Sequence, residues 1–217
     1  MKGVNNNMYK YELLQAIGGL SKVGKLPCNS WSLSALWCNV GSKLNTIKGS
    51  SCYGCYALKG NYVRFQKNMI KSYTKNLNAY NSNKDLFKID FIEYLNKYNK
   101  SGFFRWFDSG DIQSYDMLLN IVEIAKKTPT IKHWVPTKEY ALITRYKKEF
   151  KTFPKNLIIR VSAPMLDTKI KGFKYTSSIV KNSKMKSNCN AYKNQGKCLD
   201  CRLCWDKSIK DITYKYH

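Results

Sequence analysis

Apolar side chains recur at helical spacing in two consecutive segments near the middle of the chain. In both segments the apolar positions are three or four residues apart, which places them on one face of a helix. The first set is Phe65, Met69, Tyr73, Leu77 and Tyr80, and the second is Leu86, Ile89, Ile92 and Leu95. We therefore expect two amphipathic helices that bury these residues.

The next part of the chain alternates between short apolar runs and longer helical patterns. Strands are expected at 102–107 (GFFRWF), 131–136 (IKHWVP) and 156–162 (NLIIRVS), and helices at 114–127 and 138–150. The first of these helices has Ser114 or Asp116 near its N-terminal cap. Strand–helix alternation indicates an α/β fold with parallel strands joined by right-handed crossovers.

The flanking segments lack such periodicity. Residues 1–60 are punctuated by glycines and read as irregular, and 165–188 are polar and loop-like. Residues 189–217 form a cysteine-rich tail. We expect one domain over 1–217, with an α/β core at 61–164 between an irregular segment (1–60) and a loop with the tail (165–217).

Length and composition favour one soluble globular unit. The chain has 217 residues, of which 43% are hydrophobic and 14% aromatic, enough for one sizeable core. The N-terminal residues contain no apolar run of signal-peptide length, and no stretch approaches about 18 apolar residues. We expect a cytoplasmic protein with no membrane partner.

The charge balance points to an anionic partner. The formal net charge is +24, from 38 Lys and Arg against 14 Asp and Glu. Such an excess favours polyanions, and nucleic acid or a nucleotide is the commonest partner of this kind. Abundant Lys, Asn, Tyr and Ile are also typical of AT-rich genomes, but that bias does not explain the scarcity of Asp and Glu.

Polar side chains follow each of the three expected strands. The first runs into Asp108-Ser109-Gly110-Asp111, the second into Lys138, and the third carries Arg160 and Ser162. The carboxyl ends of parallel strands meet at one edge of a sheet, so these groups predict a shared pocket. Asp and Ser at such positions also cap helices, which is the simpler interpretation of each residue alone. As catalytic candidates we take Asp108, Asp111, Lys138 and Arg160, the last two because their charges suit an anionic substrate.

Eight cysteines fall into two groups, Cys28, Cys38, Cys52 and Cys55 near the N-terminus and Cys189, Cys198, Cys201 and Cys204 near the C-terminus. A cytoplasmic location disfavours disulfides. Cys28, taken alone, reads as a small buried apolar residue. The remaining seven are the candidate metal ligands.

Zinc and iron–sulfur ligation both remain open. Cys52 and Cys55 with Cys201 and Cys204 would make a four-thiolate zinc site, but that arrangement leaves Cys198 without a role. A C-x2-C-x2-C run with one further cysteine upstream is more typical of iron–sulfur ligation. We expect one or two clusters, of the 4Fe–4S type, and keep zinc as the alternative.

Several blocks of the chain resemble the uncharacterised "gene product 88" family of bacteriophages. The blocks are LPCNSWSLSALWCNVGSKL, GSSCYGCYALKGNY, FRWFDSGDIQS, HWVPTKE, IRVSAPM and GKCLDCRLCWD, which together span residues 26 to 206. The resemblance implies a phage or other mobile-element origin, and therefore a bacterial host cell, without an established activity.

A weaker likeness is to radical SAM proteins. Cys52-x2-Cys55-Tyr56-Ala57 is similar to the end of their cluster loop, although the usual first cysteine position is Lys48 here, so Cys38 would supply the third ligand. The likeness implies a partial parallel βα barrel. It also implies that Ser109, Gly110 and Asp111 hold S-adenosylmethionine and that the C-terminal cysteines ligate an auxiliary cluster. Ser162 is a further cofactor-binding candidate.

Three functions are therefore considered. The first is a cluster-dependent, radical-SAM-like enzyme acting on a nucleotide or nucleic acid, and the second is a non-enzymatic nucleic-acid-binding protein with a structural cluster or zinc ion. In the second, bases would stack on Tyr53, Tyr56, Tyr62, Trp106 and Trp134. The third is a nuclease in which Asp108 and Asp111 bind a hard cation.

Overall fold

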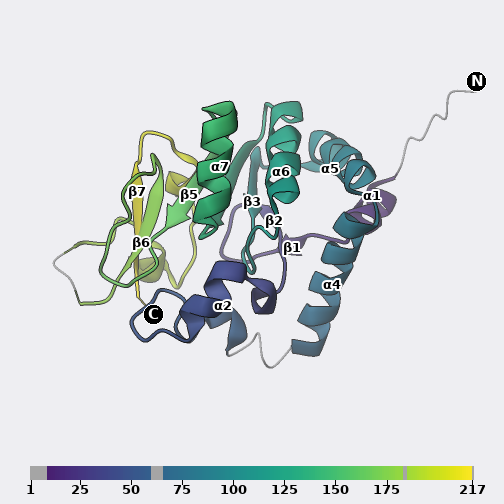
Figure 1. The fold of residues 1–217 in the computed structure, drawn as a ribbon. Helices are drawn as coiled ribbons and strands as arrows, with labels where there is room; N and C mark the ends of the chain where they lie inside the picture. Colours follow the sequence, from purple (N-terminus) through teal and green to yellow (C-terminus); the bar gives the residue numbers. More distant parts are fainter. Residues whose placement is uncertain (1–8, 60–65, 183–184, 217) are drawn as a thin grey trace, which may run out of the picture.

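The computed structural model describes residues 9–59, 66–182 and 185–216 and shows a mixed α/β fold around one sheet (Figure 1). The described residues form seven strands, whose spatial order in the sheet equals their order in the chain. They are β1 (Ser21–Lys22), β2 (Asn29–Trp31), β3 (Phe103–Trp106), β4 (Lys132–Thr137), β5 (Leu157–Ser162), β6 (Thr176–Val180) and β7 (Asp211–Lys215). Only the β1–β2 pair is antiparallel, so β2 to β7 form a parallel sheet.

The described part of the chain contains six α-helices. They are α1 (Lys10–Ala16), α2 (Asn39–Asn45), α4 (Gln66–Ser82), α5 (Lys84–Tyr98), α6 (Tyr115–Lys127) and α7 (Tyr140–Phe150). Helices α5, α6 and α7 lie side by side along one face of the sheet (Figure 1). Short 3-10 turns occur at Ala35–Trp37, Tyr56–Leu58, Ala191–Asn194 and Leu203–Trp205.

The main core lies between the sheet and these helices. Alternate residues of β3 and β5 point into it, as the two-residue repeat of a strand requires: Phe104 and Trp106, and Leu157, Ile159 and Val161. An aromatic group fills its centre, where Trp31 of β2 lies 5.4 Å from Phe87 and 6.0 Å from Trp106, ring centre to ring centre. Trp31 is fixed by a 2.9 Å hydrogen bond that its indole N–H donates to the carbonyl of Ile17. This contact ties the segment after α1 to the start of the parallel sheet.

The opposite face of the sheet is covered by the C-terminal tail. Trp134 of β4 and Ile158 of β5 point to this side and pack with Trp205 and Cys28 in a second apolar cluster. Trp205 stacks edge-on against Trp134 at 5.2 Å between ring centres and donates a 2.9 Å hydrogen bond to the carbonyl of Phe104. The tail is therefore an integral layer of the fold.

The expected strands and helices of the middle region are confirmed, but one helix buries only part of the expected set. In α5 Leu95 is buried and Ile92 packs against the core as expected, whereas Leu86 and Ile89 are more than half exposed. Phe87, Phe91 and Tyr94 are buried in their place. Aromatic rings remove more surface from water than aliphatic chains, so the aromatic stripe takes the core side.

The expected boundaries of the α/β core are too narrow. The segment expected to be irregular contributes α1, α2 and strands β1 and β2, and the polar stretch and the tail contribute β6 and β7. Strand β6 reads TSSIV, and its Thr176 and Ser178 donate hydrogen bonds to Asp211 of β7 at 2.8 and 3.2 Å. A strand paired through polar side chains carries no apolar alternation for a sequence pattern to detect.

One buried histidine lies in the main core. Trp106 donates its indole N–H to Nδ1 of His133 at 3.3 Å, and Nε2 lies 2.8 Å from the hydroxyl of Thr128. Because that hydroxyl donates to the carbonyl of Ile124 at 2.7 Å, Nε2 carries the proton and the ring is neutral. Burial lowers the pKa of His133 from 6.5 to about 3.

The protein should therefore lose stability in mild acid through His133. Below pH 6.5 the unfolded chain binds a proton at this residue while the folded chain does not, so this contribution is full above pH 6.5 and falls towards pH 3. Between pH 7 and pH 5, urea unfolding of the wild type should lose about 2 kcal/mol more than that of His133→Gln. An equal loss in both proteins would contradict the assignment.

Candidate functional site

The cysteine loop between β2 and α4 is fastened across the carboxyl ends of the parallel strands. The amide of Val40 donates to the carboxylate of Glu139 after β4 at 3.2 Å, and the amide of Ser51 donates to the carbonyl of Pro164 after β5 at 2.7 Å. The hydroxyl of Tyr56 donates to the carbonyl of Asp108 after β3. The loop therefore spans the rim on which the strand-end residues were expected to meet.

Three thiols gather in this loop. A side-chain carbon built at Gly41 would lie 3.5 Å from Sγ of Cys38 and 3.8 Å from Sγ of Cys52, so a glycine there leaves these thiols room to approach. Burial raises the pKa of Cys38, and nearby Asp111, Cys55 and Cys52 raise it further. We call Cys38, Cys52 and Cys55 the rim thiols.

The two acidic residues of the rim hold neighbouring strands together. Asp108 accepts hydrogen bonds from the hydroxyls of Ser30, at 2.8 Å, and Ser32, which joins the ends of β2 and β3. Asp111 accepts from the hydroxyl of Thr137 at 2.6 Å and the amide of Lys138 at 2.8 Å, which joins β3 to β4. Burial raises the pKa of Asp111. Both carboxylates are thus engaged within the protein.

The Ser-Gly-Asp turn is packed against the end of β2. Ser109 is buried, and its carbonyl accepts the amide of Leu33 at 3.1 Å. Gly110 has φ +81°, and a side-chain carbon there would lie 2.7 Å from the carbonyl oxygen of Leu33. Only glycine combines this backbone angle with such a close approach.

Lys138 and Ser162 lie on the same rim. The ammonium of Lys138 is close enough to the rim thiols to offset part of the rise that burial causes in the pKa of Cys55. The hydroxyl of Ser162 lies 3.0 Å from that of Ser177, and its carbonyl accepts the hydroxyl of Tyr140 at 3.0 Å. The structure thus brings together the strand-end candidates, apart from Arg160.

Arg160 does not point to this rim, which corrects its expected role on an anionic substrate. It is fully buried beneath the tail, and all its N–H donors face backbone carbonyls. These carbonyls belong to Leu203, Cys204, Asp206, Ile209 and Lys210, at 2.8 to 3.5 Å. A guanidinium has five N–H groups, so none remains for a ligand.

The four C-terminal thiols lie apart from the rim thiols and line a cavity of about 30 Å³ in the tail. We call Cys189, Cys198, Cys201 and Cys204 the tail thiols. Sγ of Cys204 lies 3.4 Å from the hydroxyl of Tyr214 on β7, and burial raises its pKa to about 11. Cys52 and Cys55 lie with Cys38 instead, so a zinc site shared by Cys52, Cys55, Cys201 and Cys204 is not the arrangement found.

Cys28 is buried in the apolar cluster beside the tail, as expected for a small apolar residue. Burial raises its pKa to about 12, and the charge of Cys198 contributes to this rise. Cys28 is therefore close to the tail thiols and separate from the rim thiols.

As the side chains stand, no three His, Cys, Asp or Glu residues of the described chain are arranged around a common ion position. The thiols of each set lie near one another, but their side chains would have to rotate about the Cα–Cβ bonds before either set could bind a metal.

None of the described helices is both long and apolar enough to cross a membrane.

Sequence reasoning missed Arg105, which lies between the two groups of thiols. Its guanidinium stacks over the ring of Trp134, 4.6 Å from the ring centre. Its positive charge interacts electrostatically with Tyr56 and Asp108 near the rim and with Tyr214 and Cys204 in the tail. Its Nε is buried with no hydrogen-bond partner in the described part of the chain. Arg105 is the third residue of FFRW, where only the alternation of the strand would place it on the tail side.

The aromatic residues expected to stack on bases divide into two kinds. Trp106 and Trp134 are buried in the core, so the prediction that they stack on bases is wrong. Tyr53 and Tyr56 are 50% and 62% exposed and remain accessible in the cysteine loop. Tyr62 lies outside the described residues.

Comparison with known proteins gives one match. The family model described as "Gene product 88" matches residues 5–207. No curated protein and no solved structure matches the chain.

Gly110 and Gly172 provide a matched pair of substitutions. Both have positive φ, but a side-chain carbon at Gly172 meets nothing within 4 Å. Gly172→Ala should therefore cost only the backbone strain, about 1 kcal/mol. Gly110→Ala should cost about 2 to 4 kcal/mol, because it also displaces the backbone after β2. Thermal unfolding of the two variants measures the difference, and equal losses would contradict the packing described.

Arg160→Lys tests the attachment of the tail. Lysine cannot reach five carbonyls, so this change should lower the free energy of unfolding by about 3 kcal/mol or more. It should also open the tail to proteolysis. Arg145→Lys, at an exposed ion pair on α7, is the control and should change stability little. A tail that stays protected in Arg160→Lys would show that other contacts hold it.

Proposed function

The chain belongs to the Gene product 88 family, and from its gathered thiols we propose that it is an iron–sulfur protein that modifies a nucleotide or nucleic acid with S-adenosylmethionine. The observation that carries this proposal is the position of the rim thiols. Cys38, Cys52 and Cys55 lie in one loop over the carboxyl ends of parallel strands, which is where α/β folds place their chemistry.

The order of elements supports the proposal. A strand (β2) precedes the cysteine loop, helices follow it, and the next strand (β3) runs into the Ser-Gly-Asp turn. Strands that follow one another in space as in sequence, with helices along one face, suit the partial parallel βα barrel implied by the likeness to radical SAM proteins. The proposal therefore includes that finer description of the fold.

The number of rim thiols suits a cluster with one open iron. After rotation of their side chains, Cys38, Cys52 and Cys55 would hold a 4Fe–4S cluster, which would supply the iron that binds S-adenosylmethionine. The positive charge of Lys138 beside the rim thiols favours their ionised, ligating form. Asp111 would keep the Lys138 backbone in place through the hydrogen bond it already accepts from that amide.

Arg105 takes the role that Arg160 cannot have. Its guanidinium lies on the tail side of the sheet, close to the hydroxyl of Tyr56. Tyr56 is the residue after Cys55, one of the rim thiols. A half-buried guanidinium whose Nε has no hydrogen-bond partner among the described residues is suited to an anionic group such as a phosphate. We therefore propose Arg105 as the residue that holds the charged part of a substrate near the rim thiols.

A second candidate function rests on the tail thiols. Four thiols around one small cavity could occupy all four coordination positions of a metal ion, which is typical of a structural site. A zinc ion or a closed cluster there would staple the tail to the sheet in a nucleic-acid-binding protein without catalysis. The two candidates are compatible, since the rim thiols and the tail thiols do not share residues.

The nuclease alternative has less support. It needs two carboxylates free to bind a hard cation, whereas Asp108 and Asp111 each accept hydrogen bonds from neighbouring strands.

Anaerobic purification followed by iron, sulfide and zinc analysis tests the proposal. The wild type should be brown and contain about four irons for a cluster at the rim thiols. The triple variant Cys38→Ser, Cys52→Ser, Cys55→Ser should lose that iron and the formation of 5′-deoxyadenosine from S-adenosylmethionine under reducing conditions. Cys28→Ala is the matched control, because Cys28 belongs to neither set.

Serine substitution of all four tail thiols separates the two candidates. It should lower stability and remove any second metal while leaving the rim iron in place. A colourless wild-type protein with zinc alone would refute the catalytic proposal and leave the structural one.

A further inference from the structure

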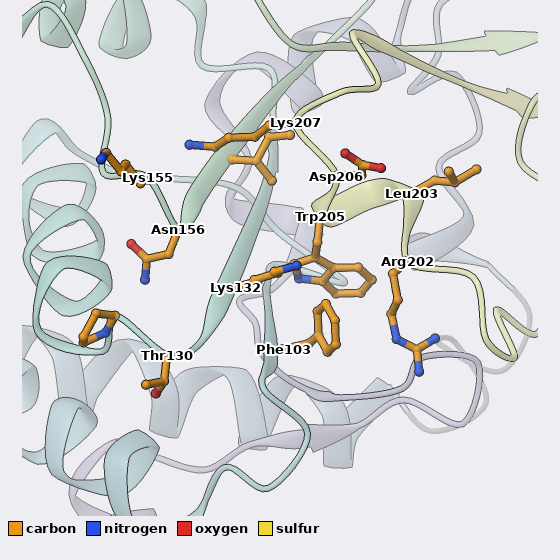
Figure 2. A pocket seen from close by; sticks show the side chains of 12 residues that line it. Phe103, Thr130, Lys132, Lys155, Asn156, Arg202, Leu203, Trp205, Asp206 and Lys207 are labelled. Carbon is orange, nitrogen blue, oxygen red and sulfur yellow. The ribbon is translucent and has the colours of Figure 1, made fainter.

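A cavity of about 630 Å³ lies at the opposite end of the sheet from the rim thiols (Figure 2). Phe103 and Lys132 are the first residues of β3 and β4, and Asn156 immediately precedes β5, so the cavity opens at the amino ends of these strands. The remaining wall is the tail, from Arg202 to Lys207. The volume of the cavity lies within the range of small-molecule sites, roughly 300 to 1,000 Å³.

The lining is strongly basic. It contains Lys132, Lys155, Arg202 and Lys207 against a single acid, Asp206. Figure 2 shows Lys155 and Lys207 on one side of the cavity and Arg202 on the other, with Trp205 between them. Positive charges that converge from several elements on a hollow favour an anion inside it.

These charges are not held in close ion pairs, although Lys132 lies near enough to Asp206 to lower the pKa of its carboxyl. None of the ion pairs among the described residues includes any of the four basic side chains. Lys132 and Lys155 are exposed, and Lys207 uses one donor on the carbonyl of Pro154 at 3.0 Å. Burial and the nearby ammonium of Lys174 lower the pKa of Lys207, and a bound phosphate would offset this repulsion.

The cavity also has a fixed acceptor and an apolar wall. The amide nitrogen of Asn156 donates to the carbonyls of Ala125, Thr128 and Ile131 at 2.8, 3.0 and 2.8 Å. Its oxygen Oδ1 is therefore held in one orientation and suits a hydroxyl or amino group of a ligand. Phe103 and Leu203, which are half-buried, supply the apolar surface, with Ile158 and Trp205 buried behind them.

We propose that this cavity binds a nucleotide through its phosphates, either as a free nucleotide or as one unit of a nucleic-acid strand. The basic side chains bind the phosphates, Oδ1 of Asn156 accepts from the sugar or the base, and the apolar wall packs against the base. The site is independent of any metal at the rim thiols, because the two lie at opposite ends of the strands.

The experiment compares two double variants with the same change of charge. Lys132→Gln with Lys155→Gln removes two exposed positive charges from the cavity, and Lys71→Gln with Lys75→Gln removes two exposed charges from α4. Binding of a fluorescent twenty-nucleotide single strand is measured by anisotropy over a range of salt. Binding of adenosine triphosphate is measured by calorimetry at physiological ionic strength.

The cavity variant should bind at least one of these probes about tenfold more weakly than the wild type, whereas the control should stay within about threefold. For the strand, the slope of log K against log salt should also fall by about 1.4 in the cavity variant, or about 0.7 for each charge removed. Loss of triphosphate binding identifies a free nucleotide as the ligand, and loss confined to the strand identifies a nucleic acid.

Asp206→Asn provides a test of opposite sign. The amide can still accept the hydrogen bond that the Ser208 amide donates to this side chain at 2.8 Å, while the only negative charge of the lining is removed. Binding should become about threefold to tenfold tighter. The proposal is overturned if the cavity and control variants weaken binding equally, or if the wild type binds neither probe.

Discussion

A guanidinium buried in the sheet dictates how the second face of this protein is covered. Removing a charge from water is very costly unless it is fully hydrogen-bonded, so Arg160 requires acceptors that its own strand cannot supply. They come from the backbone of residues 203–210, which must fold over β5 to deliver them. That path lays Trp205 on Trp134, places Cys204 beside Tyr214 and builds one wall of the basic cavity. One residue thus couples the sheet, the tail thiols and the cavity.

The two ends of the sheet are chemically different. Thiols, buried acids and hydroxyls occupy the carboxyl rim, whereas lysine and arginine surround the cavity at the amino ends. A six-residue strand such as β4 is about 20 Å long, so one mononucleotide cannot occupy both places. If both proposals hold, a mononucleotide in the cavity is not the molecule modified at the rim, and only an extended ligand would contact both ends.

Local signals in the sequence predicted the local structure well. The helix beginning after Ser114 has that serine as its cap. The spacing of the cysteines left open whether Cys52 and Cys55 join the C-terminal thiols, and the fold places them with Cys38 instead. Non-local contacts were out of reach. Arg160 bonds to a residue 44 positions away, and the β6–β7 pair is held by hydroxyls and one carboxylate. Neither contact produces a periodic pattern in the sequence. For this reason the sequence placed Arg160 with the strand-end residues and predicted no strand after β5.

Strand order has a consequence for how the protein is made. Because each parallel strand adds beside the previous one, the sheet can grow in the direction of synthesis, with β2 to β5 and their helices assembled early. The tail leaves the ribosome after β2 to β5, and until it arrives Arg160 and Trp134 stay open to solvent. A nascent chain stalled before residue 203 would therefore present an unfinished sheet face, and the arrival of the tail would close it.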